Sequence, residues 1–215
     1  MSAKHNRSFL VKVLILNMLS SVALADSVVQ ADSVVQAASV APVDPKKLVE
    51  QADFALDREE LDNAAKLYHQ AAELNYTPAQ VALGNLAISA QEPEEAVGWF
   101  LMAATQGDAA GQHQLALSYL SGTGIEINAT KALYWVRRSA GKNYLPAVIL
   151  IANAYRSGGF SGLVAVDLDQ AQSWDDKASR LKKIEQKKAQ ERKEEQEAIL
   201  KKRQEERAAK EKLNK

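Results

Sequence analysis

The middle of the sequence repeats itself, and this repetition limits the folds that the chain can adopt. Three segments share the pattern Ala-x-x-Trp, which places Trp99, Trp135 and Trp174 at spacings of 36 and 39 residues. An earlier segment carries Tyr68 at the position of Phe100, 32 residues before it. Periods of this length are typical of helical repeats, whose units bury their apolar faces against one another. The three tryptophans are therefore expected to be core residues in a stack of helical units.

Within each repeat, the sequence predicts two helices joined by a turn. Nearly identical segments, Asn-Tyr-x-Pro-Ala, begin at Asn75 and Asn143, and Gly107 lies at the matching point between them. Asn and Gly accept the left-handed conformation at the end of a helix, and a following proline prevents the helix from continuing. Small residues recur at one site of the first helix: Gly84, Ala116 and Ala152. Two helices can approach closely at such a site, so each unit is predicted as helix A, a turn and helix B.

The clearest copy of the repeat runs from Leu115 to Trp135. It contains Tyr119, a Gly122-x-Gly124 turn followed by an aliphatic residue, and Lys-Ala-x-x-Trp at its end. This pattern resembles the Sel-one-like repeat (SLR) family, a relative of the tetratricopeptide repeats. The resemblance covers about residues 61–178.

These repeats predict an all-α protein: a short α-solenoid of helix-turn-helix repeats of the SLR or tetratricopeptide type, with a long charged C-terminal helix. Two links depart from the pattern, because residues 87–96 lack the Gly-x-Gly turn and residues 158–162 lengthen the last turn. These departures affect the expected curvature and leave the fold class unchanged. Asp44 followed by Pro45 is a favourable helix start. The helical repeat domain is therefore predicted at 45–180, with about four units.

Residues 1–25 are predicted to be a signal peptide. Lys4, Arg7 and Lys12 precede a short apolar stretch, and Ala23 and Ala25 supply the small residues that a signal peptidase reads. A membrane anchor would need about 20 apolar residues, and polar side chains interrupt this stretch. The chain is therefore expected to be exported, periplasmic or secreted, and not membrane-spanning after signal cleavage.

Residues 26–44 are predicted to be a flexible linker with a hexapeptide duplication. The sequence Ala-Asp-Ser-Val-Val-Gln occupies 25–30 and again 31–36, and it has no core-forming period. A duplicated linker tolerates such a change in length. A docking strand is the alternative interpretation.

The charges are distributed unevenly along the chain. Residues 26–176 hold nine basic and 19 acidic side chains, whereas residues 177–215 hold 15 basic and eight acidic ones. Residues 181–215 consist of good helix formers without a heptad of apolar residues, which predicts a charged, basic helical tail and no coiled coil. A solvated helix is one interpretation, and a contact with a protein or an anionic envelope surface is the other. The tail has no aromatic side chain to stack on bases, so no nucleic acid partner is expected.

The sequence carries no recognisable catalytic constellation. It has no Cys and only three His, which excludes a thiolate metal site and argues against a histidine-rich one. It contains neither a complete phosphate-binding loop nor a nucleophile elbow. No catalytic residue, metal or cofactor is predicted, and the chain is expected not to be an enzyme.

The predicted function is a non-enzymatic adaptor or scaffold in the cell envelope. It would bind a peptide or protein segment on the concave, A-helix face of the solenoid, with the basic tail as a second contact. The resemblance implies this role, since exported bacterial members of the family commonly act as adaptors. A structural, self-associating rod is one alternative, and an enzyme acting on cell-wall or carbohydrate substrates is another.

The predicted groove positions are those that vary between copies of helix A. They form three rows: Val81, His113 and Ile149; Asn85, Leu117 and Asn153; and Ile88, Leu120 and Arg156.

Overall fold

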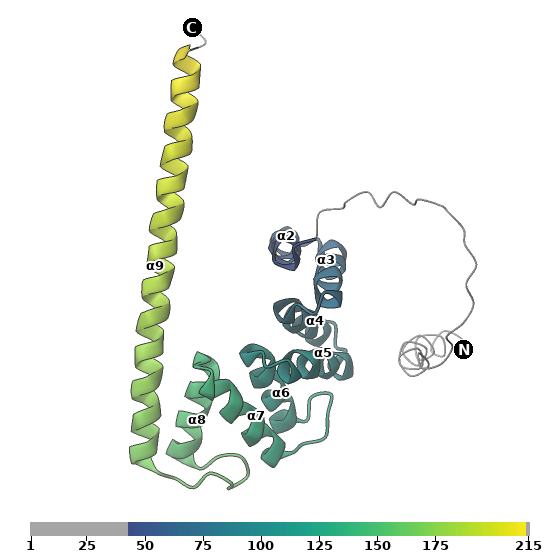
Figure 1. The fold of residues 1–215 in the computed structure, drawn as a ribbon. Coiled ribbons are helices and arrows are strands. Elements are labelled where there is room, and N and C mark those ends of the chain that lie inside the picture. The colour runs from purple at the N-terminus through teal and green to yellow at the C-terminus, as the bar shows by residue number, and fades with distance from the viewer. Residues whose placement is uncertain (1–42, 214–215) are drawn as a thin grey trace, which may run out of the picture. The chain divides into compact units, whose positions relative to one another are not determined.

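The helices follow the repeat that the sequence predicts. In a computed structural model of the chain, the described residues are 43–213, with side chains to Arg207. They form eight helices: α2 (Pro45–Asp57), α3 (Leu61–Glu73), α4 (Thr77–Ser89), α5 (Pro93–Thr105), α6 (Ala109–Ser121), α7 (Ala129–Gly141), α8 (Leu145–Ser157) and α9 (Leu168–Leu213). The even-numbered helices are the A helices, and each packs against the B helix that follows it (Figure 1). The prediction of an all-α solenoid with a long C-terminal helix is confirmed.

The N-terminal predictions fall outside the described residues. This applies to the signal peptide at 1–25 and to residues 26–42 of the linker, so both stay predictions. Between residues 43 and 213, no helix is long and apolar enough to span a lipid bilayer.

Short turns reverse the chain because one residue in each turn adopts a left-handed conformation. Asn75 and Asn143 have φ angles of 58° and 62°, as their sequence context predicts, and Gly107 has a φ of 90°. Glu59 and Gln91 do the same in the turns after α2 and α4, each with a φ of 61°. This conformation costs a residue with a Cβ roughly 1–2 kcal/mol. The link that lacks glycine therefore turns at Gln91, a residue whose type gives no signal for it.

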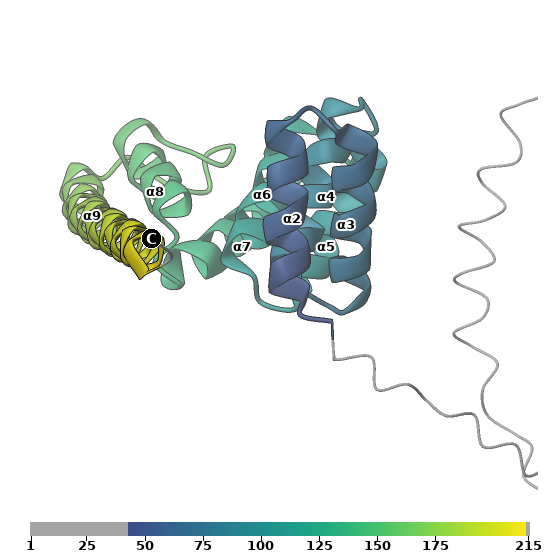
Figure 2. The ribbon, with the colours of Figure 1, turned by 90° about the horizontal axis from the view of Figure 1, so that it is seen from above.

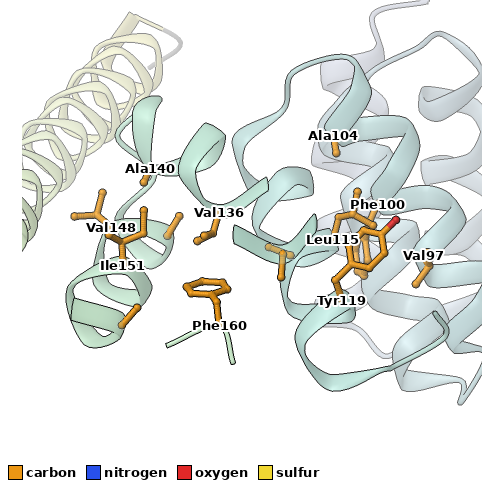
Figure 3. Packing of buried hydrophobic residues seen from close by; sticks show 14 of the residues in the cluster. Val97, Phe100, Ala104, Leu115, Tyr119, Val136, Ala140, Val148, Ile151 and Phe160 are labelled. Carbon is orange, nitrogen blue, oxygen red and sulfur yellow. The ribbon is translucent and has the colours of Figure 1, made fainter. Parts of the chain in front are cut away.

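The core is built from alanines at the helix crossings and one larger buried side chain in each of the first three B helices. Tyr68 in α3, Phe100 in α5 and Val136 in α7 hold the same repeat position and are all buried. Figure 3 shows Phe100 beside Leu115 and Tyr119 of α6. The tryptophans stand one residue earlier in each unit and are only half-buried against the rim of the core. The expectation that the tryptophans are core residues is therefore corrected to a position at the core's edge, because Phe100 and Val136, the residues after Trp99 and Trp135, face inward instead.

Helix α9 begins as the B helix of the fourth unit and continues without a break. Ala171, Trp174, Ala178 and Leu181 recur at helical spacing, lie on one face and are buried or half-buried. This face packs along α8. From residue 182 to 207 every side chain is exposed. Figures 1 and 2 show this part of α9 extending beyond α8. At 1.5 Å per residue, the part after Glu185 extends roughly 40 Å.

Candidate partner-binding surface

The exposed side of α4, α6 and α8, here called the A-helix face, carries all nine predicted groove positions. They are Val81, Asn85 and Ile88 on α4, His113, Leu117 and Leu120 on α6, and Ile149, Asn153 and Arg156 on α8. Six are exposed, and Val81, His113 and Leu120 are half-buried. Leu120 packs against the core, so it offers the least surface to a partner.

One groove brings three of the nine together. It lies mainly between α4 and α6, has a volume of about 260 Å³, and is lined by Asn85, Ile88, Phe100, Gln114, Leu117, Ser118, Ser121 and Thr123. We call it the Asn85 groove. Inside it, Nε2 of Gln114 donates a hydrogen bond to Oδ1 of Asn85 at 2.9 Å. Ile88 and Leu117 add aliphatic surface that is 40% and 38% exposed.

The lining of the Asn85 groove is polar but uncharged. It offers side-chain amides and hydroxyls next to aliphatic carbon, and no carboxylate, amine or imidazole that could exchange a proton during a reaction. Amides donate and accept hydrogen bonds at once, which suits the alternating N–H and C=O groups of a peptide backbone. The lining therefore offers hydrogen-bonding groups beside apolar carbon and no charged group.

Sequence reasoning missed the other five residues that line this groove: Phe100, Gln114, Ser118, Ser121 and Thr123. Gln114 and Ser121 stand three residues before and four residues after Leu117, so all three share one helix face. Counting along that face from Leu117 would have found them. Thr123 lies in the turn after α6, where its hydroxyl is 2.7 Å from the Ser121 hydroxyl, and no sequence pattern indicates that contact.

His113 lies outside the Asn85 groove and joins two units instead. Its ring meets the ring of Tyr144 edge-on, with the centroids 5.4 Å apart. Burial lowers the pKa of His113 from its ordinary value. Burial also raises the pKa of Tyr144, the residue that precedes α8. Burial therefore favours the neutral form of both rings, in a contact between α6 and the start of α8.

The three α8 positions also lie outside the Asn85 groove. Nη1 of Arg156 donates to Oδ1 of Asn153 at 2.5 Å, and its other terminal nitrogen forms an ion pair with Asp175 of α9. In the repeat register, Asp175 stands where α7 holds the core residue Val136. Arg156 therefore links α8 to α9. Of the three predicted positions on α8, only Ile149, which is 44% exposed, makes no side-chain hydrogen bond or ion pair.

A larger depression of about 660 Å³ lies between α2 and α3. It is lined by Lys47, Glu50, Gln51, Phe54, Ala55, Glu60, Asn63 and Leu67. Within the described residues no earlier B helix packs against α2, so this side of the first unit is open. Its lining mixes both charge signs and includes none of the predicted positions. Among residues 43–213, no three His, Asp or Glu side chains are placed to hold a metal ion together.

Paired helices, left-handed turns and a row of core side chains define the class of this protein as an α-solenoid of helical hairpins. A family model described as Sel1 repeat matches residues 57–76, 78–108 and 109–144. Residues 57–144 of this chain are therefore similar to the Sel1 repeat family, which confirms the resemblance seen in the sequence. Proteins with these repeats generally serve as protein-interaction scaffolds.

Two solved structures show the same fold. A Sel1 repeat protein from Oxalobacter formigenes matches with a TM-score of 0.60 and 23% identity, over 63% of this chain and 56% of that one. A protective antigen present in uropathogenic Escherichia coli strains, with an SLR fold, matches with a TM-score of 0.51 and 25% identity. That match covers 64% of this chain and 33% of the antigen. No curated protein matches the sequence.

Proposed function

We propose that this protein is a non-enzymatic adaptor of the cell envelope that binds a peptide or protein segment on its A-helix face. The observation that carries the proposal is the lining of the Asn85 groove. The Asn85–Gln114 amide pair lies next to exposed aliphatic carbon of Ile88 and Leu117. Solenoids use such extended faces to bind segments of other proteins.

Binding in this groove requires no covalent step and no proton transfer. A segment that crosses α4 and α6 exchanges its backbone hydrogen bonds with the two amides while its side chains cover Ile88 and Leu117. Ile149 extends the same face onto α8. Each Å² of apolar surface removed from water contributes about 25 cal/mol, so the aliphatic contacts supply affinity and the amides fix the direction of the segment.

The basic tail is the second contact in this proposal. Its side chains are exposed from residue 182 to 207, and the helix is anchored to the solenoid through Trp174 and Leu181. A partner or anionic envelope surface that meets the tail is therefore held at a fixed direction from the groove. Two linked contacts raise the effective concentration of each without any new interaction.

A pair of matched double variants tests the groove. Ile88→Asp with Leu117→Asp places two carboxylates in the Asn85 groove. Leu101→Asp with Met102→Asp does the same on the outer side of α5, where the two side chains are 43% and 44% exposed. We expect the groove variant to lose the partner captured from native extract, with unchanged circular dichroism, and the control to keep it. If both folded variants keep the partner, the binding surface lies elsewhere.

Truncation and N-terminal sequencing test the rest of the proposal. A chain ending at Glu185 keeps Leu181 and its packing, and it should keep the groove partner while losing any partner that needs the tail. Export predicts that the protein recovered from the periplasm or the medium begins at Asp26. Recovery only from the cytoplasm, with Met1 retained, would contradict it.

A further inference from the structure

The outward face of α7 differs from the rest of the solenoid in charge. Four of the nine basic residues between positions 26 and 176 lie on this helix or at its C-cap: Lys131, Arg137, Arg138 and Lys142. The helix has no acidic residue. Thr130, Leu133, Tyr134, Arg137 and Arg138 follow one another at helical spacing and line an open depression of about 430 Å³. We call this surface the α7 face.

Aromatic contacts hold one of its guanidinium groups in place. The Arg138 guanidinium lies 5.5 Å from the centroid of the Tyr134 ring and 6.0 Å from that of Trp135. Its Nη1 also donates a hydrogen bond to the Tyr134 hydroxyl at 3.0 Å. A guanidinium stacked on rings loses less freedom when it binds a carboxylate. Tyr134 is itself 52% exposed, so its ring remains available to a partner.

The cations of the α7 face are not neutralised within the described part of the chain. The ion pairs found there use Lys46, Arg58, Arg156, Lys187 and Lys193. A helix C-terminus favours nearby cations, which accounts for a positive charge at Arg138. It does not account for a second arginine beside it or for the aromatic lining.

The neighbouring B helices limit the length of an anionic partner. In the repeat register, the position of Thr130 holds Glu94 in α5 and Asp169 in α9, and the position of Arg137 holds Asp176 in α9. A long polyanion laid across α7 would therefore meet carboxylates on both sides. A short acidic segment would meet only the two arginines and the apolar lining between them.

We propose that the α7 face binds a short acidic segment of a partner protein. The segment places carboxylates on Arg137 and Arg138 and an aliphatic side chain on Leu133 and Tyr134. This surface faces outward from a B helix, so it is independent of the Asn85 groove and lets the protein hold two partners on opposite sides.

The test measures fluorescence anisotropy of a labelled peptide in which Glu-Glu-Leu is repeated, with the full chain as receptor. Arg137→Glu with Arg138→Glu should weaken binding about ten-fold or more, because two charge-assisted contacts become repulsive. Lys201→Glu with Lys202→Glu is the matched control, since these adjacent cations are exposed on α9. It should leave binding within about two-fold. A Gln-Gln-Leu peptide of the same length should not bind.

A second variant separates the positioned guanidinium from charge alone. Tyr134→Ala keeps every charge but removes the ring under Arg138, so it should weaken binding about three-fold. Tyr134→Phe keeps the ring, and its affinity for the peptide should stay closer to that of the parent chain.

The proposal is overturned if the peptide does not bind, or if the α9 control weakens binding as much as the α7 variant. It is also overturned if heparin competes at the α7 face more strongly than the peptide, which would assign the face to polyanions. The groove variant Ile88→Asp with Leu117→Asp should bind the peptide normally, so failure of one surface does not decide the other.

Discussion

Gly124 lies directly against the carbonyl oxygen of Pro93. A Cβ placed on Gly124 would be 2.1 Å from that oxygen, and Gly124 has a φ of 70°. The turn between α6 and α7 therefore crosses the first residue of α5 at backbone contact distance. The close approach leaves no room for a Cβ, and the left-handed backbone further favours glycine here. This contact is the physical reason for the second glycine of the Gly-x-Gly turn in the best copy of the repeat.

Gly124→Ala should therefore destabilise the protein strongly. The added methyl group clashes with backbone, which cannot rotate away, and the residue keeps a strained φ, so we expect a loss of about 2–4 kcal/mol in the free energy of unfolding. Gly98→Ala is the matched control, because a Cβ there meets nothing within 4 Å in the middle of α5. It should stabilise the helix by about 0.5–1 kcal/mol. Urea unfolding followed by circular dichroism measures both variants. Equal unfolding midpoints for Gly124→Ala and the parent chain would show that the turn can rearrange to accommodate the methyl group.

Tyr68→Phe tests the contact that fastens α3 to α2. The buried Tyr68 hydroxyl donates to Oδ1 of Asp53 at 2.5 Å. Removing it should cost about 0.5–1.5 kcal/mol, because the exposed Asp53 returns to water while the ring stays in place. Tyr134→Phe removes a hydroxyl from an exposed ring and should change stability by less than about 0.5 kcal/mol. A double-mutant cycle with Asp53→Asn should show that the two losses at α2 and α3 are not additive.

The fold class was predictable because its signals are local and recur in every unit. Asn75 and Asn143 mark helix ends by their own conformational preference, and Asp44 caps α2 by accepting a hydrogen bond from the backbone N–H of Lys46 at 3.0 Å. The alignment of Tyr68 with Phe100 located the core position of helix B correctly. Periodicity placed the tryptophans in the same core, but one residue of helix rotation separates the rim from the interior.

The remaining details depend on contacts between units, which no single segment specifies. Gln112 is fully buried, and its Nε2 donates to the carbonyl oxygen of Ala104, near the end of the preceding B helix. Nothing in the sequence around Gln112 indicates that this side chain is buried or that it bonds to the preceding helix. Arg156 varied between repeats and so looked like a groove residue, but Asp175 became its partner only when α9 packed on α8. Variation between copies therefore identifies positions that are not part of the core. It does not show which contact such a position makes instead.

The burial of His113 makes the free energy of unfolding depend on pH. Burial lowers the pKa of His113 in the folded chain, so the unfolded chain binds a proton more readily. The contribution of His113 is fully present above the unfolded pKa of about 6.5 and is lost as the pH falls below it. The free energy of unfolding should therefore decrease from pH 7.5 to pH 5.5. His113→Gln should flatten this part of the profile, and an unchanged slope would assign the dependence to other groups.

The Arg156–Asp175 ion pair should respond to charge reversal and recover on charge exchange. The side chains are 47% and 40% exposed, so the pair contributes at most about 1 kcal/mol. Arg156→Glu sets two carboxylates against each other and should cost a similar amount. Adding Asp175→Arg restores the attraction and should recover most of the loss in thermal unfolding at low salt. High salt should reduce both effects, and a loss that salt leaves unchanged would indicate packing by the Arg156 stem.

Two truncations should separate the part of α9 that supports the solenoid from the part that does not. Every side chain from residue 182 to 207 is exposed, so a chain ending at Glu185 should unfold at the same urea concentration as the full chain. A chain ending at Ser173 also loses Trp174, Ala178 and Leu181, which cover the core on α8. Exposing that surface should lower the midpoint and cost several kcal/mol, about 25 cal/mol for each Å² of apolar area. If the chain ending at Glu185 also unfolds at a lower urea concentration, the part of α9 after Glu185 contacts the solenoid in solution. That result would exclude its role as a separate arm.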